Sequence, residues 1–356
     1  MCQKGAFPFV NNQYFVQRPM NNQTSQLLIS LTTYGERLTT VHKTIQSLLN
    51  QSKLADKILL WLDEDEFNDS NIPTQLKSLT SKCFEIRYCH NLRSYKKLVP
   101  ALRAFPDATI ITFDDDIIYP SNLVEDLYNE CQLSPGSIIA SRGRIITLKN
   151  GDFAPYASWQ YIKNAKKIAA KYCIIPIGYG GVLYPPNSLC DEVVNEHRFM
   201  ALAPYADDIW FKVMSLLKGT ETIILQQDAS ISMVLIDGTQ ETALYITHNS
   251  GDANTRQIKA IANAFPDIHS LLQLNEFNMV KMTSHYLSDF LNEQELVQFA
   301  QANIEAIRDS AIALEKQNIR QSYVLMKLAS LLKPHGPKIK RLLQRYTVIL
   351  AKRDNK

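Results

Sequence analysis

The feature that most constrains the fold of this chain is an alternation of short apolar segments with helical patterns. Four apolar segments lie in its first third: residues 27–34, 57–62, 84–88 and 109–113. Apolar residues at helical spacing follow over 38–49 and again over 95–104. Strands that form near-continuous apolar runs between helices are typical of a parallel sheet covered on both faces. We therefore predict an α/β fold with a Rossmann-like, mostly parallel sheet and helices on both faces.

The alternation becomes less regular after residue 116, and the chain changes character again towards its end. The next expected elements are a helix, a strand, a helix and a strand, at 121–131, 137–140, 206–217 and 221–225. The first 26 residues are rich in Asn and Gln and predict an irregular arm, whereas helical periodicity dominates after residue 266. We thus expect three regions: 1–26, 27–265 and 266–356.

Composition excludes several classes of protein. The 356 residues are 46% hydrophobic and 21% charged, which is unlike collagen, low-complexity disorder or a small disulfide scaffold. The net charge of +3 is too small to predict nucleic-acid binding. There is no C-x-x-C pair among the six cysteines, no signal-peptide pattern and no apolar run of about 18 residues. These features predict a cytoplasmic protein with reduced thiols.

The candidate site follows from the expected sheet, because parallel sheets bind ligands beyond the carboxyl ends of their strands. The residues at those ends are Thr32–Arg37, Asp63 and Asp114–Asp116. Three adjacent aspartates repel one another and need a compensating cation. Carboxylate oxygens suit Mg²⁺ or Mn²⁺, either of which also binds a diphosphate. An acidic loop that caps the following helix would explain the same residues, and both interpretations stay open.

A second acidic group opens the helix expected from residue 206. Asp207 and Asp208 are adjacent there, and carboxylates in a first helical turn are often simple caps. Alternatively, one of the two is a general base that accepts a proton from an incoming hydroxyl. A metal site and a base at the same sheet edge would together suit a group-transfer reaction.

Weaker candidates surround these two groups. Arg37, Lys96 and Lys97 carry charge suited to phosphate, although solvated basic residues on helix faces are commoner. Tyr34 is placed to stack on a nucleobase or to pack at a strand end. His248 offers a nitrogen ligand for the same metal, although a lone His is more often structural.

Familiar phosphate-binding signatures are missing from the chain. There is no G-x-x-x-x-G-K-[ST] loop, no G-x-G-x-x-G after the first strand and no G-x-S-x-G elbow. Phosphate would therefore be held by metal and side chains. Gly180 and Gly181, in the segment Gly178-Tyr179-Gly180-Gly181, allow a close approach of backbone to a ligand.

Four motifs in order make residues 27–265 resemble a known enzyme family. They are Ile29-Ser30-Leu31-Thr32-Thr33-Tyr34 with Arg37 and Thr44–Ser52; Ser94-Tyr95-Lys96-Lys97-Leu98 with Asp114-Asp115-Asp116; Gly180–Pro186; and Ala206-Asp207-Asp208-Ile209-Trp210. The chain resembles bacterial glycosyltransferases of the GT-A fold, in the branch related to family 2 that builds cell-surface polysaccharide or lipopolysaccharide. The resemblance implies a nucleotide-diphospho-sugar transferase fold over 27–265, with a helical C-terminal extension.

The resemblance also implies roles for particular residues. The donor-binding set would be Thr32, Thr33, Tyr34, Arg37, Asp63, Lys96, Lys97, Asp114, Asp115, Gly180 and Gly181. The metal would be held by Asp116, with Asp114 and His248 as further ligands, and Asp208 would be the base beside Asp207. Two stretches depart from the family pattern: Asn254-Thr255-Arg256-Gln257 lacks an expected Asp, and Arg142-Gly143-Arg144 replaces Arg-x-His.

The implied activity is a metal-dependent, inverting transfer of a sugar from a nucleotide sugar, a UDP-sugar foremost. The acceptor would be a saccharide or lipid-linked saccharide. Two other functions remain open: a sugar-phosphate nucleotidyltransferase, which also pairs such a sheet with aspartates, and a non-catalytic saccharide-binding or scaffold protein.

The end of the chain predicts a basic amphipathic helix over 338–353. Its apolar residues recur at helical spacing: Ile339, Leu342, Leu343, Tyr346, Ile349 and Leu350. Basic residues flank them: Lys338, Lys340, Arg341, Arg345, Lys352 and Arg353. Such a helix can lie in a membrane interface or dock on the catalytic domain. We favour peripheral contact with the inner face of the cell membrane, because lipid-linked acceptors are found there.

Overall fold

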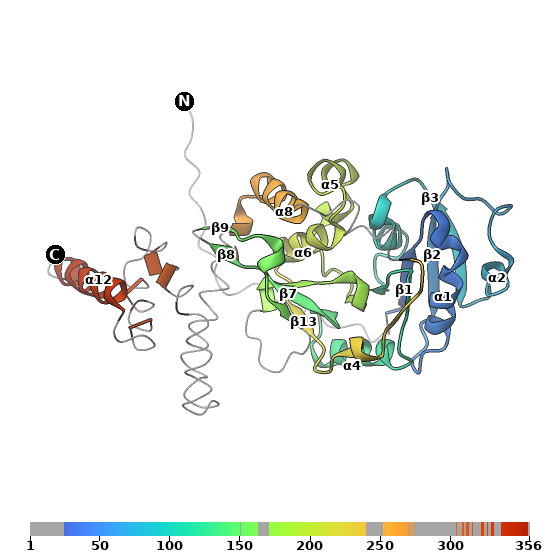
Figure 1. Ribbon diagram of the computed structural model, residues 1–356, viewed down its shortest axis with the longest axis horizontal. Helices are drawn as coiled ribbons and strands as arrows, with labels where there is room; N and C mark the ends of the chain where they lie inside the picture. The colour runs from blue at the N-terminus through green and yellow to red at the C-terminus, as the bar shows by residue number, and fades with distance from the viewer. Residues whose placement is uncertain are drawn as a thin grey trace.

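A computed structural model describes residues 25–149, 151–162, 171–239, 252–269, 271–272 and 336–354, with isolated positions between 304 and 330. Its centre is a seven-stranded sheet of order β13-β6-β12-β4-β1-β2-β3 (Figure 1). The strands are β1 (Leu27–Thr32), β2 (Lys57–Asp63), β3 (Phe84–Cys89), β4 (Thr109–Thr112), β6 (Ile138–Ala140), β12 (Val182–Tyr184) and β13 (Thr222–Ile224). All neighbours are parallel except β12, which is antiparallel to both β4 and β6.

Helices and short strands surround the sheet. The helices are α1 (Val41–Leu49), α2 (Thr74–Lys77), α3 (Val99–Ala104), α4 (Leu123–Leu133), α5 (Glu196–Leu202), α6 (Asp207–Lys218), α8 (Ala253–Ala264) and α12 (Pro337–Asp354). Single 3₁₀ turns are η1 (Gly35–Thr39), η2 (Arg93–Lys97), η3 (Tyr156–Ser158), η4 (Lys171–Cys173), η5 (Gly178–Gly180), η6 (Asp191–Val194) and η7 (Ala229–Ser232). Small sheets are formed by β10 (Tyr161–Ile162), β7 (Gly143–Ile145) and β11 (Ile174–Pro176); by β5 (Ile117–Ile118) and β14 (Val234–Leu235); and by β8 (Leu148–Lys149) and β9 (Asp152–Phe153).

Two apolar layers cover the sheet, one on each face. Successive residues of a strand point to opposite faces, so Leu28 and Ile29 of β1 belong to different clusters. The cluster that contains Leu28 includes residues of α3, α6 and α8, and extends as far along the chain as Leu272. The cluster that contains Ile29 includes residues of α1 and α4. The predicted α/β class, with a mostly parallel sheet between two helical layers, is confirmed.

The helix predicted over 95–104 is divided into η2 and α3. Pro100 lies in the first turn of α3, where its missing N–H is tolerated. In a continuous helix its ring would clash with the carbonyl four residues earlier. The chain therefore makes a tight turn over Arg93–Lys97, which leaves Tyr95, Lys96 and Lys97 buried.

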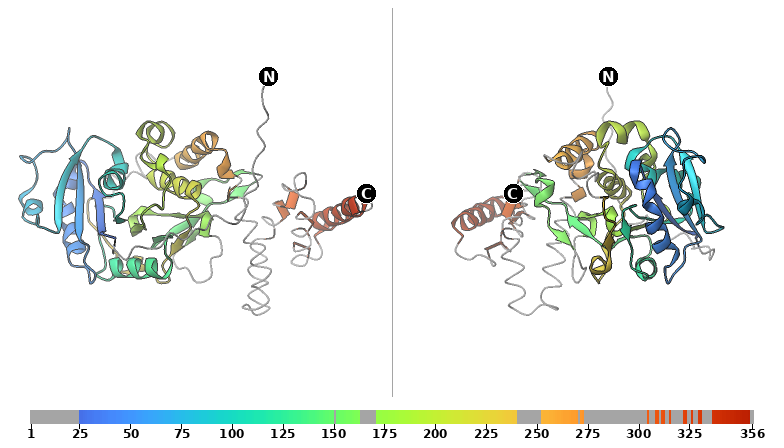
Figure 2. Two further views of the ribbon diagram at one scale, coloured as in Figure 1. Left: turned by 180° about the vertical axis from the view of Figure 1, so that it is seen from behind. Right: turned by 45° about the vertical axis from the view of Figure 1, so that its right-hand side comes forward.

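The C-terminal helix α12 buries its apolar face against other C-terminal residues. Ile339 and Tyr346 are buried in a separate cluster with Ile304 and Met326. The Tyr346 hydroxyl also donates to the carbonyl of Ala311. Figure 2 shows α12 away from the central sheet. The buried part of the apolar face thus packs on the C-terminal region, whereas the docking alternative expected it on the catalytic domain. No helix within the described ranges is long and apolar enough to cross a membrane.

A lysine lies in the interior of the α/β domain. Lys212 of α6 is 1% exposed, and its Nζ is 3.4 Å from Thr222 Oγ1 on β13. Burial lowers the pKa of Lys212 to about 7, while Cys173 and Glu221 oppose the shift only in part. In the unfolded chain, the same lysine has a pKa of about 10.4.

We predict that Lys212→Met removes a pH dependence from the free energy of unfolding. Between pH 7 and 10 the unfolded wild type binds a proton that the folded state does not, so its stability rises with pH by up to about 1.4 kcal/mol per pH unit. The methionine variant lacks this pH dependence, so its gain in stability over wild type is largest at pH 7. Urea unfolding at pH 7, 8 and 9 measures the difference. Lys218→Met, an exposed change on the same helix, is the control, and a constant difference between wild type and Lys212→Met would contradict the prediction.

Candidate functional site

The acidic triplet that follows β4 is divided between two cations. Asp115 is buried and accepts hydrogen bonds from Thr33 Oγ1 (2.5 Å) and Arg37 Nη1 (2.7 Å). Asp116 Oδ2 is 3.2 Å from the same Arg37 Nη1, and Arg37 Nη2 donates to the carbonyl of Thr239. Burial disfavours the charge of Arg37, but Asp115 and Asp116 raise its pKa above the ordinary value. Two of the three aspartates therefore form an internal ion network.

The third aspartate meets the acidic pair of α6 at a single lysine. Lys97 Nζ is 3.2 Å from Asp114 Oδ1, 2.8 Å from Asp207 Oδ2 and 3.7 Å from Asp208 Oδ1. The Lys97 side chain is 8% exposed, so its charge is satisfied by these carboxylates and not by water. Burial opposes that charge, yet the three carboxylates raise the pKa of Lys97 well above its usual value. The two acidic groups predicted from sequence thus form one cluster.

Asp208 is the more accessible member of the acidic pair. Its side chain is 26% exposed, against 11% for Asp207, and its Oδ2 accepts a hydrogen bond from the backbone N–H of Gly178 at 2.9 Å. Burial raises the pKa of Asp208 to about 7, with Lys97 lowering it and Asp207 raising it further. A carboxylate with a pKa near 7 suits proton transfer at neutral pH.

The glycine segment, residues 178–181, packs against this cluster through Gly178. A Cβ atom on Gly178 would lie 2.6 Å from Lys97 Nζ and 2.8 Å from Asp208 Oδ1, so a side chain there would displace these two charged groups. Gly180 and Gly181 would place a Cβ 2.2 Å from Ser141 Oγ and 2.5 Å from the Phe113 ring. The close approach that these glycines allow is therefore made by the protein itself, and their predicted contact with a donor stays a prediction.

The remaining predicted donor residues lie around the ends of β1 and β2. Asp63 and Lys96 are both buried and form an ion pair at 3.8 Å. Burial lowers the pKa of Lys96, and Asp63 opposes that shift. Thr32 Oγ1 donates to the carbonyl of Trp61, and the Arg37 guanidinium is 5.2 Å from the centre of the Tyr34 ring. Lys96 and Lys97 are adjacent in sequence, yet they neutralise carboxylates of different strands.

A metal held by one or two of these carboxylates would need substrate oxygens to complete its ligands, and the predicted metal stays a prediction. Among the residues that the structure describes, no three metal-ligating side chains converge. Asp114 is the most exposed of the triplet, at 33% of its side chain, against 6% for Asp115 and 12% for Asp116. Mg²⁺ is often bound through one or two carboxylates together with substrate phosphates. His248, the other predicted ligand, lies outside the described residues.

Two residues at the site were not predicted from sequence. The Tyr119 hydroxyl accepts from the backbone N–H of Asp114 at 3.1 Å and donates to the carbonyl of Tyr179 at 3.1 Å. It thereby joins the acidic turn to the glycine segment. Gly178 was part of a noted motif, but its contact with Asp208 crosses 30 residues of sequence. A tyrosine five residues beyond an acidic strand end carries no sequence signal for such a role.

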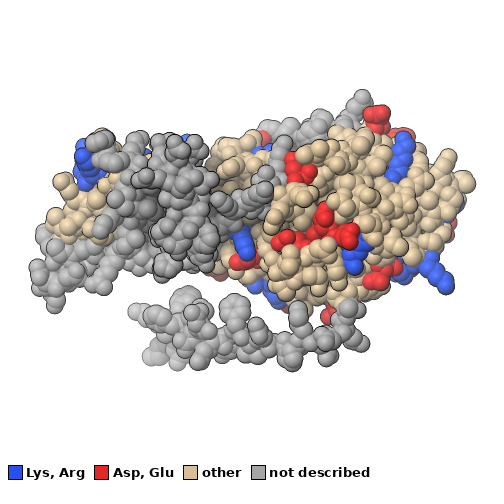
Figure 3. All heavy atoms as spheres, turned by 90° about the horizontal axis from the view of Figure 1, so that it is seen from below, with Lys and Arg blue, Asp and Glu red and all other residues tan. Residues whose placement is uncertain are grey.

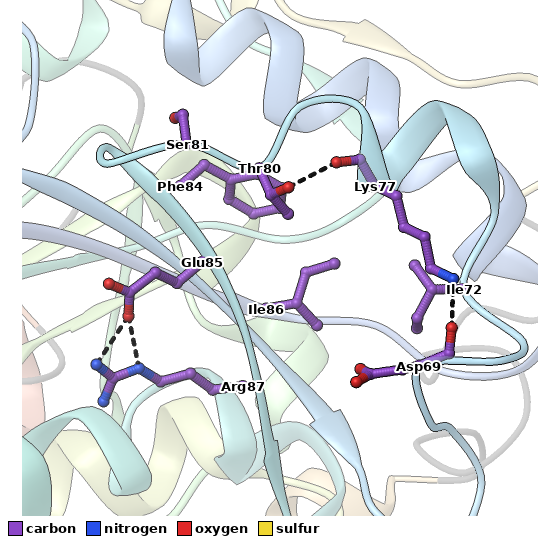
Figure 4. Close-up of a pocket in the computed structure, with 9 residues that line it drawn as sticks. All are labelled: Asp69, Ile72, Lys77, Thr80, Ser81, Phe84, Glu85, Ile86 and Arg87. Atoms are coloured by element: carbon purple, nitrogen blue, oxygen red, sulfur yellow. Dashed lines mark hydrogen bonds and ion pairs between the residues drawn. The ribbon is translucent and has the colours of Figure 1, made fainter.

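The surface and its hollows add little to this site. On the coloured part of the face shown in Figure 3, basic side chains are scattered and acidic ones gather near the middle, so the described residues form no basic stripe there. A pocket of about 550 Å³ lies along the edge strand β3, lined by residues such as Lys77 and Phe84 (Figure 4). Its polar side chains contact one another, as Glu85 and Arg87 do, or backbone carbonyls of the lining, as Thr80 does with Lys77. None of the residues that line it belongs to the acidic cluster.

Comparisons with known proteins show only distant likeness. No family model matches the sequence, and no curated protein matches it. Among solved structures, a UDP-glucose pyrophosphorylase from Acinetobacter baumanii is similar at 8% identity and a TM-score of 0.34, over 58% of this chain and 88% of that one. A 4-diphosphocytidyl-2C-methyl-D-erythritol synthase from Anaerococcus prevotii is similar at 13% identity and 0.39, over 61% and 92%. The fold class therefore rests on the strand order and packing described above.

We predict that Lys97→Met destabilises the protein in a pH-dependent way. Removing the shared cation leaves carboxylates without compensation, which costs about 3 kcal/mol for a buried pair. The folded-state pKa of Asp208, which Lys97 lowers in the wild type, would then rise further, so the deficit is largest above neutrality and shrinks as pH falls and this carboxylate becomes protonated. Chemical unfolding at pH 8, 6.5 and 5 measures this change.

The matched control is Lys57→Met, which removes a partly exposed lysine paired with Glu85. Exposed ion pairs contribute about 1 kcal/mol or less, so the free energy of unfolding of this variant should stay near that of wild type at every pH. A Lys97→Met deficit that is absent, or equal at pH 8 and pH 5, would show that Lys97 does not hold the cluster together.

Proposed function

We propose that the chain is a nucleotide-sugar-dependent glycosyltransferase that moves a sugar, with inversion, onto a saccharide acceptor of a cell-surface glycan. The observation that carries this proposal is the meeting of the two acidic groups at Lys97. One group follows a central strand, where parallel sheets bind their ligands, and the other opens a helix. A donor diphosphate beside the first and an acceptor hydroxyl beside the second would then be neighbours.

Asp208 is the base in this proposal. Its carboxylate takes the proton of the acceptor hydroxyl, whose oxygen attacks the anomeric carbon while the bond to the diphosphate breaks. Its partial exposure and a pKa of about 7 favour this role over Asp207, which is less exposed and closer to Lys97. Asp207 then holds Lys97 and keeps it beside Asp208.

The donor lies against the ends of β1, β2 and β4 in this proposal. Thr32, Tyr34 and Asp63 border the nucleoside, for which a UDP-sugar is the expected source. Mn²⁺ or Mg²⁺ would be held by Asp114 and Asp116 together with the diphosphate, where it would stabilise the charge of the departing group. Asp115, which is buried with Arg37 and Thr33, positions this turn without reaching the donor.

Two alternatives are separated by simple measurements. Titration of the full-length chain with UDP, with and without Mn²⁺, distinguishes an enzyme from a non-catalytic scaffold that kept the fold. Mass spectrometry of a reaction with a panel of nucleotide sugars then distinguishes the two enzymes. Released nucleoside diphosphate indicates glycosyl transfer, whereas release or use of pyrophosphate indicates a sugar-phosphate nucleotidyltransferase.

A lipid-linked acceptor remains part of the proposal, with peripheral contact at the inner face of the membrane. Because Ile339 and Tyr346 are buried in the C-terminal cluster, that contact would use basic side chains of α12 rather than its apolar face. Such contact depends on anionic lipid and weakens with salt. The division of the chain at residues 26 and 265 likewise stays a prediction.

We predict that Asp208→Asn lowers kcat by about 10²–10⁴-fold, because general-base catalysis contributes that much. Affinity for UDP should be unchanged, since the base contacts the acceptor and not the nucleotide. Asp191→Asn changes an exposed carboxylate in the first turn of η6 and serves as the control. Full turnover in Asp208→Asn with none in Asp207→Asn would reverse the two roles, and activity in both would leave the pair as a helix cap.

We also predict that Asp114→Asn and Asp116→Asn each reduce the affinity for UDP in Mn²⁺ to the level seen without metal. Isothermal titration of the folded variants measures it, with melting temperature as a check on the fold. Asp107→Asn, an exposed change just before β4, should bind as wild type does. Metal-dependent binding that survives in both variants would place the metal elsewhere.

A further inference from the structure

A second charged cluster borders the glycine segment, residues 178–181, near Asp208. It contains two arginines and three partly exposed tyrosines: Arg142, Arg144, Tyr156, Tyr161 and Tyr179. None of these residues has a role in the chemistry proposed above.

Arg142 is buried with an unused hydrogen-bond donor. The residue is 6% exposed, and its Nε has no hydrogen-bond partner among the described residues. Its guanidinium carbon is 4.4 Å from the centre of the Tyr179 ring and 5.8 Å from that of Tyr161. Asp228 is its ion-pair partner, at a long 3.8 Å. A buried polar group without a partner is costly, which suggests that a ligand completes this guanidinium.

Arg144 is held in one orientation but stays accessible. It lies on β7 directly opposite Tyr161 of β10, and its Nη1 donates to the carbonyl of Trp159 at 2.9 Å. The rings of Tyr156 and Tyr161 are centred 5.2 Å and 5.5 Å from its guanidinium carbon. Arg144 is partly exposed, so the remaining N–H groups can reach a ligand.

Backbone pairing places this cluster next to the proposed base. The N–H of Ile177 donates to the carbonyl of Arg142, and the next residue, Gly178, donates to Asp208. Burial raises the pKa of Tyr156, and the negative charge of Asp208 is the next largest contribution. Tyr156 therefore lies within electrostatic reach of both Asp208 and Arg144.

The two clusters carry opposite charge. Asp114, Asp207 and Asp208 share one lysine and leave an excess of negative charge. In the part of the chain that the structure describes, Arg142 and Arg144 have one carboxylate within ion-pair distance, that of Asp228, and leave an excess of positive charge. An anion that is not accompanied by a metal cation would be repelled from the first cluster and attracted to the second.

We propose that Arg142 and Arg144 form an acceptor subsite that binds the carboxylate or phosphate of an anionic saccharide. Arginine presents a planar fork that suits both anions, and the tyrosine rings offer flat surfaces for the sugar. The anion fixes the acceptor so that a hydroxyl lies at Asp208. This inference rests on the proposed function and names the class of its acceptor.

The test compares saccharides that differ only in charge. Ligand-observed NMR titration of the full-length chain would use a uronic-acid disaccharide, a phosphorylated disaccharide and the neutral disaccharide of the same backbone, each with and without UDP and Mn²⁺. We expect one of the two acidic ligands to bind about tenfold or more tightly than the neutral one, because hydrogen bonds to charged groups are worth that much. The acidic ligand with the higher affinity identifies the anion as a carboxylate or a phosphate.

Variants connect that preference to the cluster. Arg144→Gln should abolish the preference for the acidic ligand while leaving UDP affinity as in wild type, and Arg144→Lys should keep part of it. The control is Arg198→Gln on α5, whose arginine lies 4.8 Å from the Phe265 ring. It should change neither the preference for the acidic ligand nor the affinity for UDP. Melting temperatures confirm that each variant is folded.

The outcomes separate this inference from the proposed function. Equal binding of acidic and neutral saccharides, or equal loss in Arg198→Gln, overturns the subsite. An Arg144→Gln variant that loses UDP affinity instead makes the arginine a donor ligand and also overturns it. If the acidic preference is present but UDP never binds, the subsite stands and the transferase proposal fails.

Discussion

One lysine ammonium holds the candidate site together. Lys97 brings its charge from η2 to within 3.7 Å of three carboxylates that come from the end of β4 and the start of α6. Buried carboxylates without a cation would either repel one another or bind protons. The lysine can reach them because Tyr95 and Leu98, on either side of it, are anchored in the core, and because Pro100 prevents a continuous helix there. Core packing thus supplies the geometry, and the ion pairs depend on it.

Adjacent residues of one acidic turn, which lies beyond the end of β4, serve different purposes because their side chains meet different partners. Asp115 is drawn inwards to Arg37 and Thr33, whereas Asp114 faces Lys97 and keeps a third of its side chain exposed. An acidic triplet therefore contains a structural member and an accessible one. The capping interpretation does not describe Asp115, whose partners are Thr33 and Arg37, because the helix that follows has Asn122 at its N-cap. Metal binding at this turn stays a prediction.

Sequence patterns predicted the strands well and the contacts of the site poorly. β1, β2 and β4 follow from near-continuous apolar runs, which are typical of a doubly covered sheet, whereas the edge strand β3 alternates apolar and polar residues. The antiparallel direction of β12 could not be predicted in this way, because a short apolar run indicates a strand but not whether it runs parallel to its neighbours. Lys97 was expected to bind phosphate, but its partners lie 17 and more than 100 residues away. Ion pairs of that kind are determined by tertiary packing, which local periodicity does not contain.

The glycine segment joins the two charged clusters because it has no side chains where they approach it. Gly178 lies against Lys97 and Asp208, and Gly180 lies against Ser141 and Arg142. A methyl group at Gly178 would displace the Lys97 ammonium and the Asp208 carboxylate, and one at Gly180 would displace the Ser141 hydroxyl. The backbone itself also carries the connection, since Ile177 is bonded to Arg142 and Gly178 to Asp208. An acceptor held by its anion on one side of this turn would therefore present its hydroxyl at a fixed distance on the other, which is what an acid–base reaction at a sugar hydroxyl requires.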